Sequence, residues 1–142
     1  MHFWWRSSWR VHTPQQRLLG QASNGDVVTT NFARDYRATN AVEDTTQDGD
    51  RKPRQCLKLE LQAQGPDAHY PRVEMWVDAS NHRPVKARFY ADMGALLKTA
   101  YYRRYENAFG TERPTETVII DGLEPDWVTV MRYTDWVKRE VP

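Results

Sequence analysis

The feature that most constrains this chain is an alternation of apolar and polar residues between positions 70 and 101. Apolar side chains occupy every second position of two neighbouring segments, and these are Val73, Met75, Val77, Val85, Ala87 and Phe89. A side-chain period of two is what a half-buried β-strand requires. Residues 70–101 are therefore predicted to form three antiparallel strands joined by two tight turns.

The same alternation predicts how the first two of these strands pair. The pairs expected on the apolar face are Val73 with Phe89, Met75 with Ala87 and Val77 with Val85. On the polar face, Glu74 would meet Arg88 and Trp76 would meet Lys86. A slip of one residue would turn every apolar group towards water, so the pattern favours this register alone.

The second turn has its own signal. Residues 92–94 (Asp-Met-Gly) have the chemistry of a type I turn followed by a glycine bulge. The pairs then expected with the third strand are Ala91 with Ala95, Leu97 with Phe89, Thr99 with Ala87 and Lys98 with Arg88.

The remaining residues predict more strands in the same style. Strands are expected over residues 3–12, 36–44, 54–64, 113–121 and 127–135, with a short helix over residues 27–35 capped by Asp26. Residues 137–142 are expected to form a polar tail of a single domain spanning residues 1–142. Sequential hairpins without βαβ spacing predict an antiparallel meander, so the expected fold class is mainly β.

The chain carries no recognisable catalytic arrangement. Its four histidines are not spaced as metal ligands, its serines lack a nucleophile context, and its one cysteine, Cys56, is expected to be a small core residue. Twenty basic and 19 acidic residues nearly balance, which argues against nucleic acid as a partner. We therefore expect a protein that is not an enzyme and that needs no metal or cofactor.

One face of the predicted sheet is continuously apolar. Ten residues would line it, namely Leu57, Leu59, Leu61, Val73, Met75, Val77, Val85, Ala87, Phe89 and Leu97. In a small closed barrel such residues form an ordinary core, whereas in an unclosed sheet they can hold a ligand. Periodicity alone does not decide between these two interpretations.

Several segments resemble those of a known family. The segments are QRLLGQASNGDVVTTNFARDY, YPRVEMWVD, RPVKARFY and MGALLKTAYYRRYE. Over residues 16–136 their order and spacing resemble the C-terminal half of the LolA-like outer-membrane lipoprotein-sorting proteins. The resemblance implies a curved antiparallel meander that forms an unclosed half-barrel with one or two short helices. It also implies a periplasmic, non-catalytic carrier that shields acyl chains of lipoproteins or other lipids and meets a membrane transporter or receptor protein.

The resemblance leaves alternatives open. The chain could instead be a protein-interaction or sensor module of the same fold, or an inactive fragment of a longer protein. The N-terminal strands and first helix of the family have no counterpart in this sequence, and its first residues lack the apolar run of a secretory signal. An exposed edge at the first strand predicts self-association through that edge, or disorder of residues 1–15.

Overall fold

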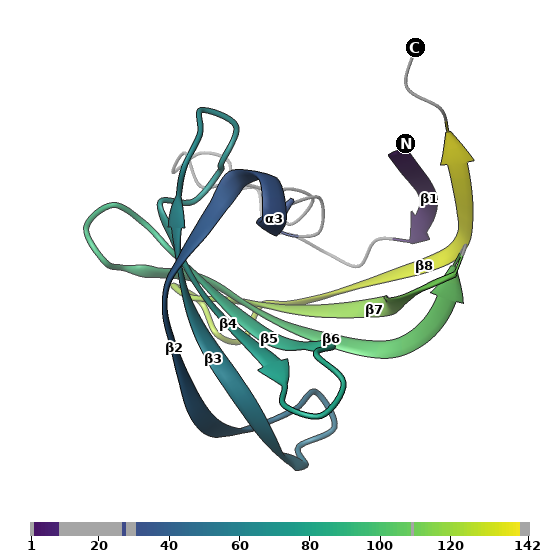
Figure 1. Ribbon diagram of the computed structural model, residues 1–142. Helices are drawn as coiled ribbons and strands as arrows, with labels where there is room; N and C mark the ends of the chain where they lie inside the picture. The colour runs from purple at the N-terminus through teal and green to yellow at the C-terminus, as the bar shows by residue number, and fades with distance from the viewer. Residues whose placement is uncertain (1, 9–26, 28–30, 109, 140–142) are drawn as a thin grey trace.

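The computed structural model describes residues 2–8, 27, 31–108 and 110–139. Its elements are β1 (His2–Ser8), α3 (Phe32–Asp35), β2 (Tyr36–Gln47), β3 (Pro53–Ala63), β4 (Arg72–Asp78), β5 (Pro84–Tyr90), β6 (Leu96–Ala108), β7 (Thr111–Asp121) and β8 (Val128–Arg139). All eight strands form one antiparallel sheet, in the spatial order β1-β8-β7-β6-β5-β4-β3-β2. The sheet curves around α3 without closing, so β1 and β2 form its two edges (Figure 1).

The predicted meander is confirmed. From β2 to β8, each strand pairs with the next strand along the chain. Only β1 departs from this order, because it lies beside the last strand, β8, with Trp4 opposite Val137. The concave side of the sheet, which faces α3, is called the inner face below, and the opposite side is called the outer face.

The predicted pairing of β4 with β5 is confirmed over most of its length. Val73 lies opposite Phe89, Met75 opposite Ala87, Glu74 opposite Arg88 and Trp76 opposite Lys86. A bulge after Trp76 then places Val77 opposite Pro84 instead of Val85. Because a bulge adds one residue to one strand, Val85 turns to the outer face, where it packs with Cys56 and Trp76. The placement of Val85 on the apolar inner face is therefore wrong.

The turn between β5 and β6 is confirmed, but the register beyond it is not. The N–H of Ala91 donates to the carbonyl of Ala95 at 2.9 Å, and Gly94 has a φ of 84°. A second bulge, between Phe89 and Tyr90, makes Leu97 an extra residue of β6. Lys98 thus lies opposite Phe89, and Ala100 and Thr99 lie opposite Ala87 and Arg88. The predicted pairs of Leu97 with Phe89, Thr99 with Ala87 and Lys98 with Arg88 are wrong for this reason.

The predicted helix is present in its last turn. The helix α3 begins after Asn31, whose Oδ1 accepts a hydrogen bond from the N–H of Arg34 at 3.0 Å. Asparagine is a favoured N-cap because its side chain satisfies an N–H that the helix leaves free. Asp26, the residue expected to cap the helix, lies outside the described residues, as do residues 28–30.

The first and last strands end at other residues than predicted. The last strand, β8, continues to Arg139, so residues 137–139 belong to a strand and not to a tail. The first strand ends at Ser8, and the rest of the segment expected over residues 3–12 lies outside the described residues.

Two buried clusters lie on opposite faces of the sheet. The larger one, on the inner face, contains Val27, Tyr36, Leu61, Tyr70, Val73, Met75, Ala87, Phe89, Ala100, Ile119 and Met131. The smaller one, on the outer face, contains Cys56, Trp76 and Val85. Cys56 is a free, buried thiol, as expected of a small core residue.

Candidate functional site

The strand registers align the inner-face side chains in rows that cross the sheet. One row is Leu61, Val73, Phe89, Lys98 and Asp121, and the next is Leu59, Met75, Ala87, Ala100, Ile119 and Thr129. In both rows the members from β3, β4 and β5 are apolar, and polar side chains occur only on β6, β7 and β8. The inner face therefore has an apolar part beneath α3 and a more polar part away from it.

A cavity of about 380 Å³ lies on the apolar part of the inner face. Its lining residues are Phe32, Ala33, Tyr36, Ala38, Leu59, Leu61, Met75, Val77 and Pro84. None of them is charged, and the volume lies near the lower end of the range for small-molecule pockets, roughly 300–1,000 Å³. Ala33 and Ala38 are exposed, and Ala38 belongs to the edge strand β2, so the cavity reaches the open edge of the sheet.

Helix α3 covers this cavity and is held in place by residues distant in sequence. The side-chain Nε2 of Gln64 donates hydrogen bonds to the carbonyls of Arg34 at 3.1 Å and Tyr36 at 3.2 Å. The N–H of Gln64 donates to the carbonyl of Asp35 at 2.8 Å. The ring of Phe32 lies 5.9 Å from that of Tyr36 and 6.2 Å from that of Phe89, measured between centroids. The helix is thus attached by polar contacts on one side and by aromatic packing on the other.

Tyr36 presents its ring to the cavity and keeps its hydroxyl out of it. The hydroxyl donates to the carbonyl of Tyr70 at 2.7 Å and accepts from the N–H of Tyr70 at 3.2 Å. Burial raises the pKa of the Tyr36 phenol, which stays neutral at physiological pH. The one polar side-chain atom among the lining residues is therefore already satisfied.

The ten residues predicted to line an apolar face fall into separate groups. Leu59, Leu61, Met75 and Val77 line the cavity. Val73, Ala87 and Phe89 are fully enclosed in the core. Leu57 and Leu97 are half-buried, and Leu97 packs against the inner cluster. Val85 lies on the outer face.

Sequence reasoning missed five of the lining residues, which are Phe32, Ala33, Tyr36, Ala38 and Pro84. A signal for two of them was present, because Phe32 lies in the predicted helix over residues 27–35 and Tyr36 directly follows it as the first residue of a predicted strand. Large aromatic rings are usually buried, so both could have been assigned to the apolar face.

The polar part of the inner face contains a buried ion pair. The Nζ of Lys98 lies 3.3 Å from Oδ2 of Asp121, and the two side chains are only 1% and 3% exposed. The other carboxylate oxygen of Asp121 accepts from the N–H groups of Leu123 and Glu124 at 2.8 and 2.9 Å. Burial lowers the pKa of Lys98, and the Asp121 carboxylate opposes that effect. Burial also opposes ionisation of Asp121, but the backbone N–H groups and Lys98 outweigh it and lower the pKa of the carboxyl.

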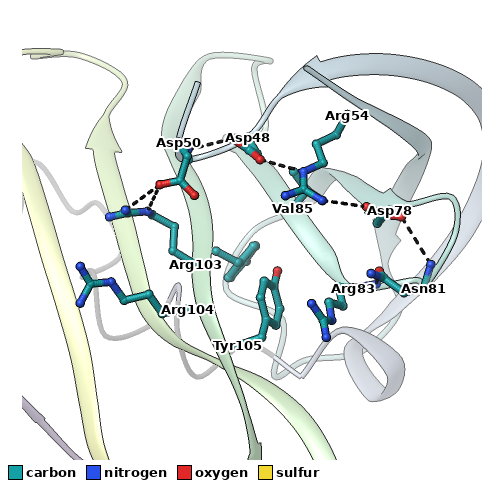
Figure 2. Close-up of a pocket in the computed structure, with 12 residues that line it drawn as sticks. Asp48, Asp50, Arg54, Asp78, Asn81, Arg83, Val85, Arg103, Arg104 and Tyr105 are labelled. Carbon is teal, nitrogen blue, oxygen red and sulfur yellow. Dashed lines mark hydrogen bonds and ion pairs between the residues drawn. The ribbon is translucent and has the colours of Figure 1, made fainter. Parts of the chain in front are cut away.

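A second pocket, of about 210 Å³, is strongly polar (Figure 2). It lies where the tip of the β2–β3 hairpin approaches β6, and its lining includes Asp48, Asp50, Arg54, Asp78, Arg83, Arg103 and Tyr105. The Nε of Arg54 lies 2.8 Å from Asp48 and its Nη1 lies 3.5 Å from Asp78. Arg103 donates to Asp50 at 2.7 Å and also to Glu116.

This polar pocket connects elements of the fold through paired charges. Arg83 donates from two nitrogens to Glu112 and lies over the ring of Tyr105, with 5.1 Å from its guanidinium carbon to the ring centroid. Burial raises the pKa of the Tyr105 phenol. The pairs of Arg103 with Asp50 and of Arg54 with Asp78 join the β2–β3 hairpin to β6 and to the end of β4. The pair of Arg83 with Glu112 joins the β4–β5 turn to β7.

Among the residues that the structure describes, no group of three His, Cys, Asp or Glu side chains is arranged to hold a metal ion. In the same part of the chain, no helix has the length and apolar character needed to cross a membrane.

The chain is similar to a protein family and to several solved structures. A protein-family model described only as an uncharacterized protein matches residues 7–142. No curated protein matches the chain significantly. Among solved structures, a LolA superfamily protein from Nitrosomonas europaea is 35% identical, with a TM-score of 0.71 over 85% of this chain and 53% of the other.

Two more distant structures share the fold. One is a domain from Vibrio parahaemolyticus named for outer membrane lipoprotein sorting, with 22% identity and a TM-score of 0.57 over 72% of this chain and 42% of the other. The other is a DUF1329 family protein from Desulfovibrio piger, with 20% identity and a TM-score of 0.60 over 81% of this chain and 46% of the other. The chain thus spans about half the length of the solved structures it matches.

Proposed function

Because this chain belongs to a LolA-like family, we propose that it binds acyl chains of lipids or lipoproteins, without catalysis, in the apolar cavity beneath α3. The residues proposed to contact the acyl chain are Leu59, Leu61, Met75 and Val77 from the predicted set, together with Phe32 and Tyr36. The remaining predicted residues on the inner face, Leu57, Val73, Ala87, Phe89 and Leu97, would support this lining from within the core or beside it.

The observation that carries the proposal is the composition of the cavity lining. All nine lining residues are apolar or aromatic, and the single hydroxyl among them is bonded to the backbone of Tyr70. Each methylene moved from water to such surroundings gains about 0.8 kcal/mol, so an acyl chain is a favourable occupant. Among the described lining residues, a polar ligand would find no free hydrogen-bonding side chain. Met75 adds a flexible thioether that can adapt to chains of different shape.

A finer proposal concerns where the protein acts. We infer a periplasmic carrier that receives lipoproteins from one membrane-associated protein and passes them to another. The similarity of the fold to that of the Vibrio parahaemolyticus domain named for outer membrane lipoprotein sorting supports this role. Self-association through the exposed edge of β1 also remains a prediction, and sedimentation at several protein concentrations tests it.

Native mass spectrometry of the protein extracted from cells tests the proposed cargo. Mass increments that match acyl species support a lipid carrier. A stoichiometric protein partner without any acyl species would instead support an interaction module of the same fold. Protein that carries neither, and that does not take up added palmitate, would contradict both functions.

A matched pair of substitutions tests the assignment of the cavity. Leu59→Asn places a polar amide in the cavity lining, and we expect it to weaken binding of a fluorescent fatty acid about tenfold, since a buried amide without a partner costs roughly 1–3 kcal/mol. Leu123→Asn makes the same change at a residue that is 55% exposed, and its affinity should match the wild type. Equal affinities for the two variants, with the fold intact by circular dichroism, would contradict the assignment.

A further inference from the structure

We propose that the free edge of β2 binds the polypeptide of a lipidated peptide as an added β-strand, while the acyl chain lies in the cavity. This inference rests on the proposed function and adds to it a site for the part of the cargo that the cavity cannot hold.

The hydrogen bonds of β3 establish which backbone groups of the edge are free. The carbonyl of Gln55 accepts from the N–H of Ala79, and the N–H of Ala63 donates to the carbonyl of Pro71, both at 3.0 Å. Both contacts point towards β4. Since the backbone groups of successive strand residues point to opposite sides, the even-numbered residues of β3 point towards β2.

Those even-numbered residues identify the bonded residues of β2. Cys56, Lys58 and Glu60 lie opposite Asp44, Val42 and Asn40. The residues that alternate with them, Ala41, Glu43 and Thr45, therefore direct their N–H and C=O groups away from β3. Because β2 is the last strand in the spatial order, no described strand pairs with these three residues, and all three are exposed.

This free segment continues directly from the mouth of the cavity. Tyr36 and Ala38 of the same strand line the cavity, and Ala38 is exposed at the sheet edge. At about 3.3 Å per residue, Ala41 lies roughly 10 Å along the strand from Ala38. An extended peptide covers that distance in about three residues. A peptide whose acyl chain enters the cavity would thus run beside the free backbone groups of β2.

The chemistry of the two sites is complementary. The described lining of the cavity has no free polar side chain for a peptide backbone, whereas the edge of β2 offers backbone donors and acceptors that no described strand pairs. Strand addition uses main-chain hydrogen bonds and so accepts cargo of many sequences.

A second copy of this chain fits the β2 edge poorly. Two-fold antiparallel pairing about Glu43 would place two glutamates directly opposite each other, which is unfavourable. The bulge between Ala38 and Asn40 also disrupts a regular self-pairing edge.

Three probes test the inference on the full chain. They are palmitamide, a palmitoylated hexapeptide of polar sequence, and the same palmitoylated peptide with N-methyl groups at alternate residues. Two or three added hydrogen bonds predict that the unmodified acyl-peptide binds about tenfold more tightly than palmitamide. The N-methylated peptide, which cannot donate to the edge, should lose this advantage.

A matched pair of variants distinguishes the contribution of the Glu43 backbone N–H to binding from that of its side chain. Glu43→Pro removes an outward N–H at an edge position where proline is tolerated, and Glu43→Ala removes the same carboxylate but keeps the N–H. We expect Glu43→Pro to weaken acyl-peptide binding about tenfold and to leave palmitamide binding unchanged, while Glu43→Ala matches the wild type. Amide hydrogen exchange at Ala41, Glu43 and Thr45 should slow with the acyl-peptide but not with palmitamide.

The outcomes distinguish this inference from the proposed function. If no probe binds, the proposed function fails and the inference fails with it. If palmitamide and both peptides bind equally, the cavity assignment stands and the strand site is wrong. Slow exchange at the edge in the protein alone, rising with concentration, would show that a second copy occupies it and would overturn the inference. If Glu43→Pro does not fold, the N-methylated peptide on the wild type decides.

Discussion

Lys98 and Asp121 bring opposite charges together inside the protein, on the polar part of the inner face. A buried ion pair is weak evidence for net stabilisation, because both charges lose their hydration. The two partners nevertheless depend on each other, since removing one of them takes from the other the opposite charge that offsets its loss of hydration. Asp121 has a further role, because it also accepts two backbone N–H groups of the β7–β8 turn.

Lys98→Met tests this dependence. The substitution removes the ammonium group that lies 3.3 Å from the buried Asp121 carboxylate, and we expect it to lower the free energy of unfolding by about 3 kcal/mol in urea denaturation. The double variant Lys98→Met with Asp121→Asn removes both charges and keeps an oxygen for the turn, so it should recover part of that loss. Wild-type stability of the single variant, or no recovery in the double variant, would contradict the dependence.

For Lys98 and Val85, the sequence did not predict the face of the sheet on which the side chain lies. Alternation identified the strands and the register of β4 with β5, because one face of each strand must be apolar. Each residue was nevertheless assigned to the wrong face, since a bulge inserts one residue and reverses the alternation beyond it. The apolar pattern contains no signal for where such a residue enters.

At the scale of elements, helix α3 depends on its attachments. Four residues cannot form a stable helix alone, because the first turn costs more than it gains. The structure supplies the Asn31 cap and the hydrogen bonds from Gln64, which lies about 30 residues further along the chain. The sequence predicted a helix in this region, but not its anchor. A contact between such distant residues leaves no local pattern.

The β7–β8 turn fits closely against the start of β6 at Gly122. A Cβ at this position would lie 2.0 Å from the carbonyl oxygen of Leu96. Since that oxygen belongs to a paired strand and cannot move freely, we expect Gly122→Ala to lower the free energy of unfolding by about 1–3 kcal/mol or more. Gly65→Ala is the control, because nothing lies within 4 Å of its Cβ, and its change should be within about 0.5 kcal/mol. Equal thermal midpoints for the two variants would show that the turn accommodates a side chain.

At the scale of the whole molecule, the polar residues of the sheet are organised as ion pairs around buried carboxylates. Glu74 pairs with Lys58 at 2.9 Å, and Glu116 pairs with Arg132 at 2.8 Å. These two carboxylates are only 5% and 1% exposed, so the cations cover them. Among the described residues, these buried carboxylates are therefore part of the fold and are not exposed charges for a partner.

This organisation predicts how stability depends on pH. Burial opposes ionisation of Glu74, but hydrogen bonds from Tyr90 and Lys58 outweigh it and lower the pKa of its carboxyl. Burial likewise opposes ionisation of Glu116, and Arg132, Arg103 and Arg104 lower the pKa of that carboxyl. Because both values are lower in the folded protein than the ordinary glutamate value of about 4.3, the unfolded chain binds more protons in that range. The stability that these groups contribute should be complete above about pH 5 and should be lost as the pH falls through the pKa values that the two carboxyls have in the folded protein.

Urea midpoints measured between pH 7 and pH 3 test this prediction. The Glu116→Gln variant should be less stable than the wild type at pH 7 but should lose less stability as the pH falls. If the wild type and Glu116→Gln lose stability in parallel as the pH falls, Glu116 does not contribute to the acid sensitivity.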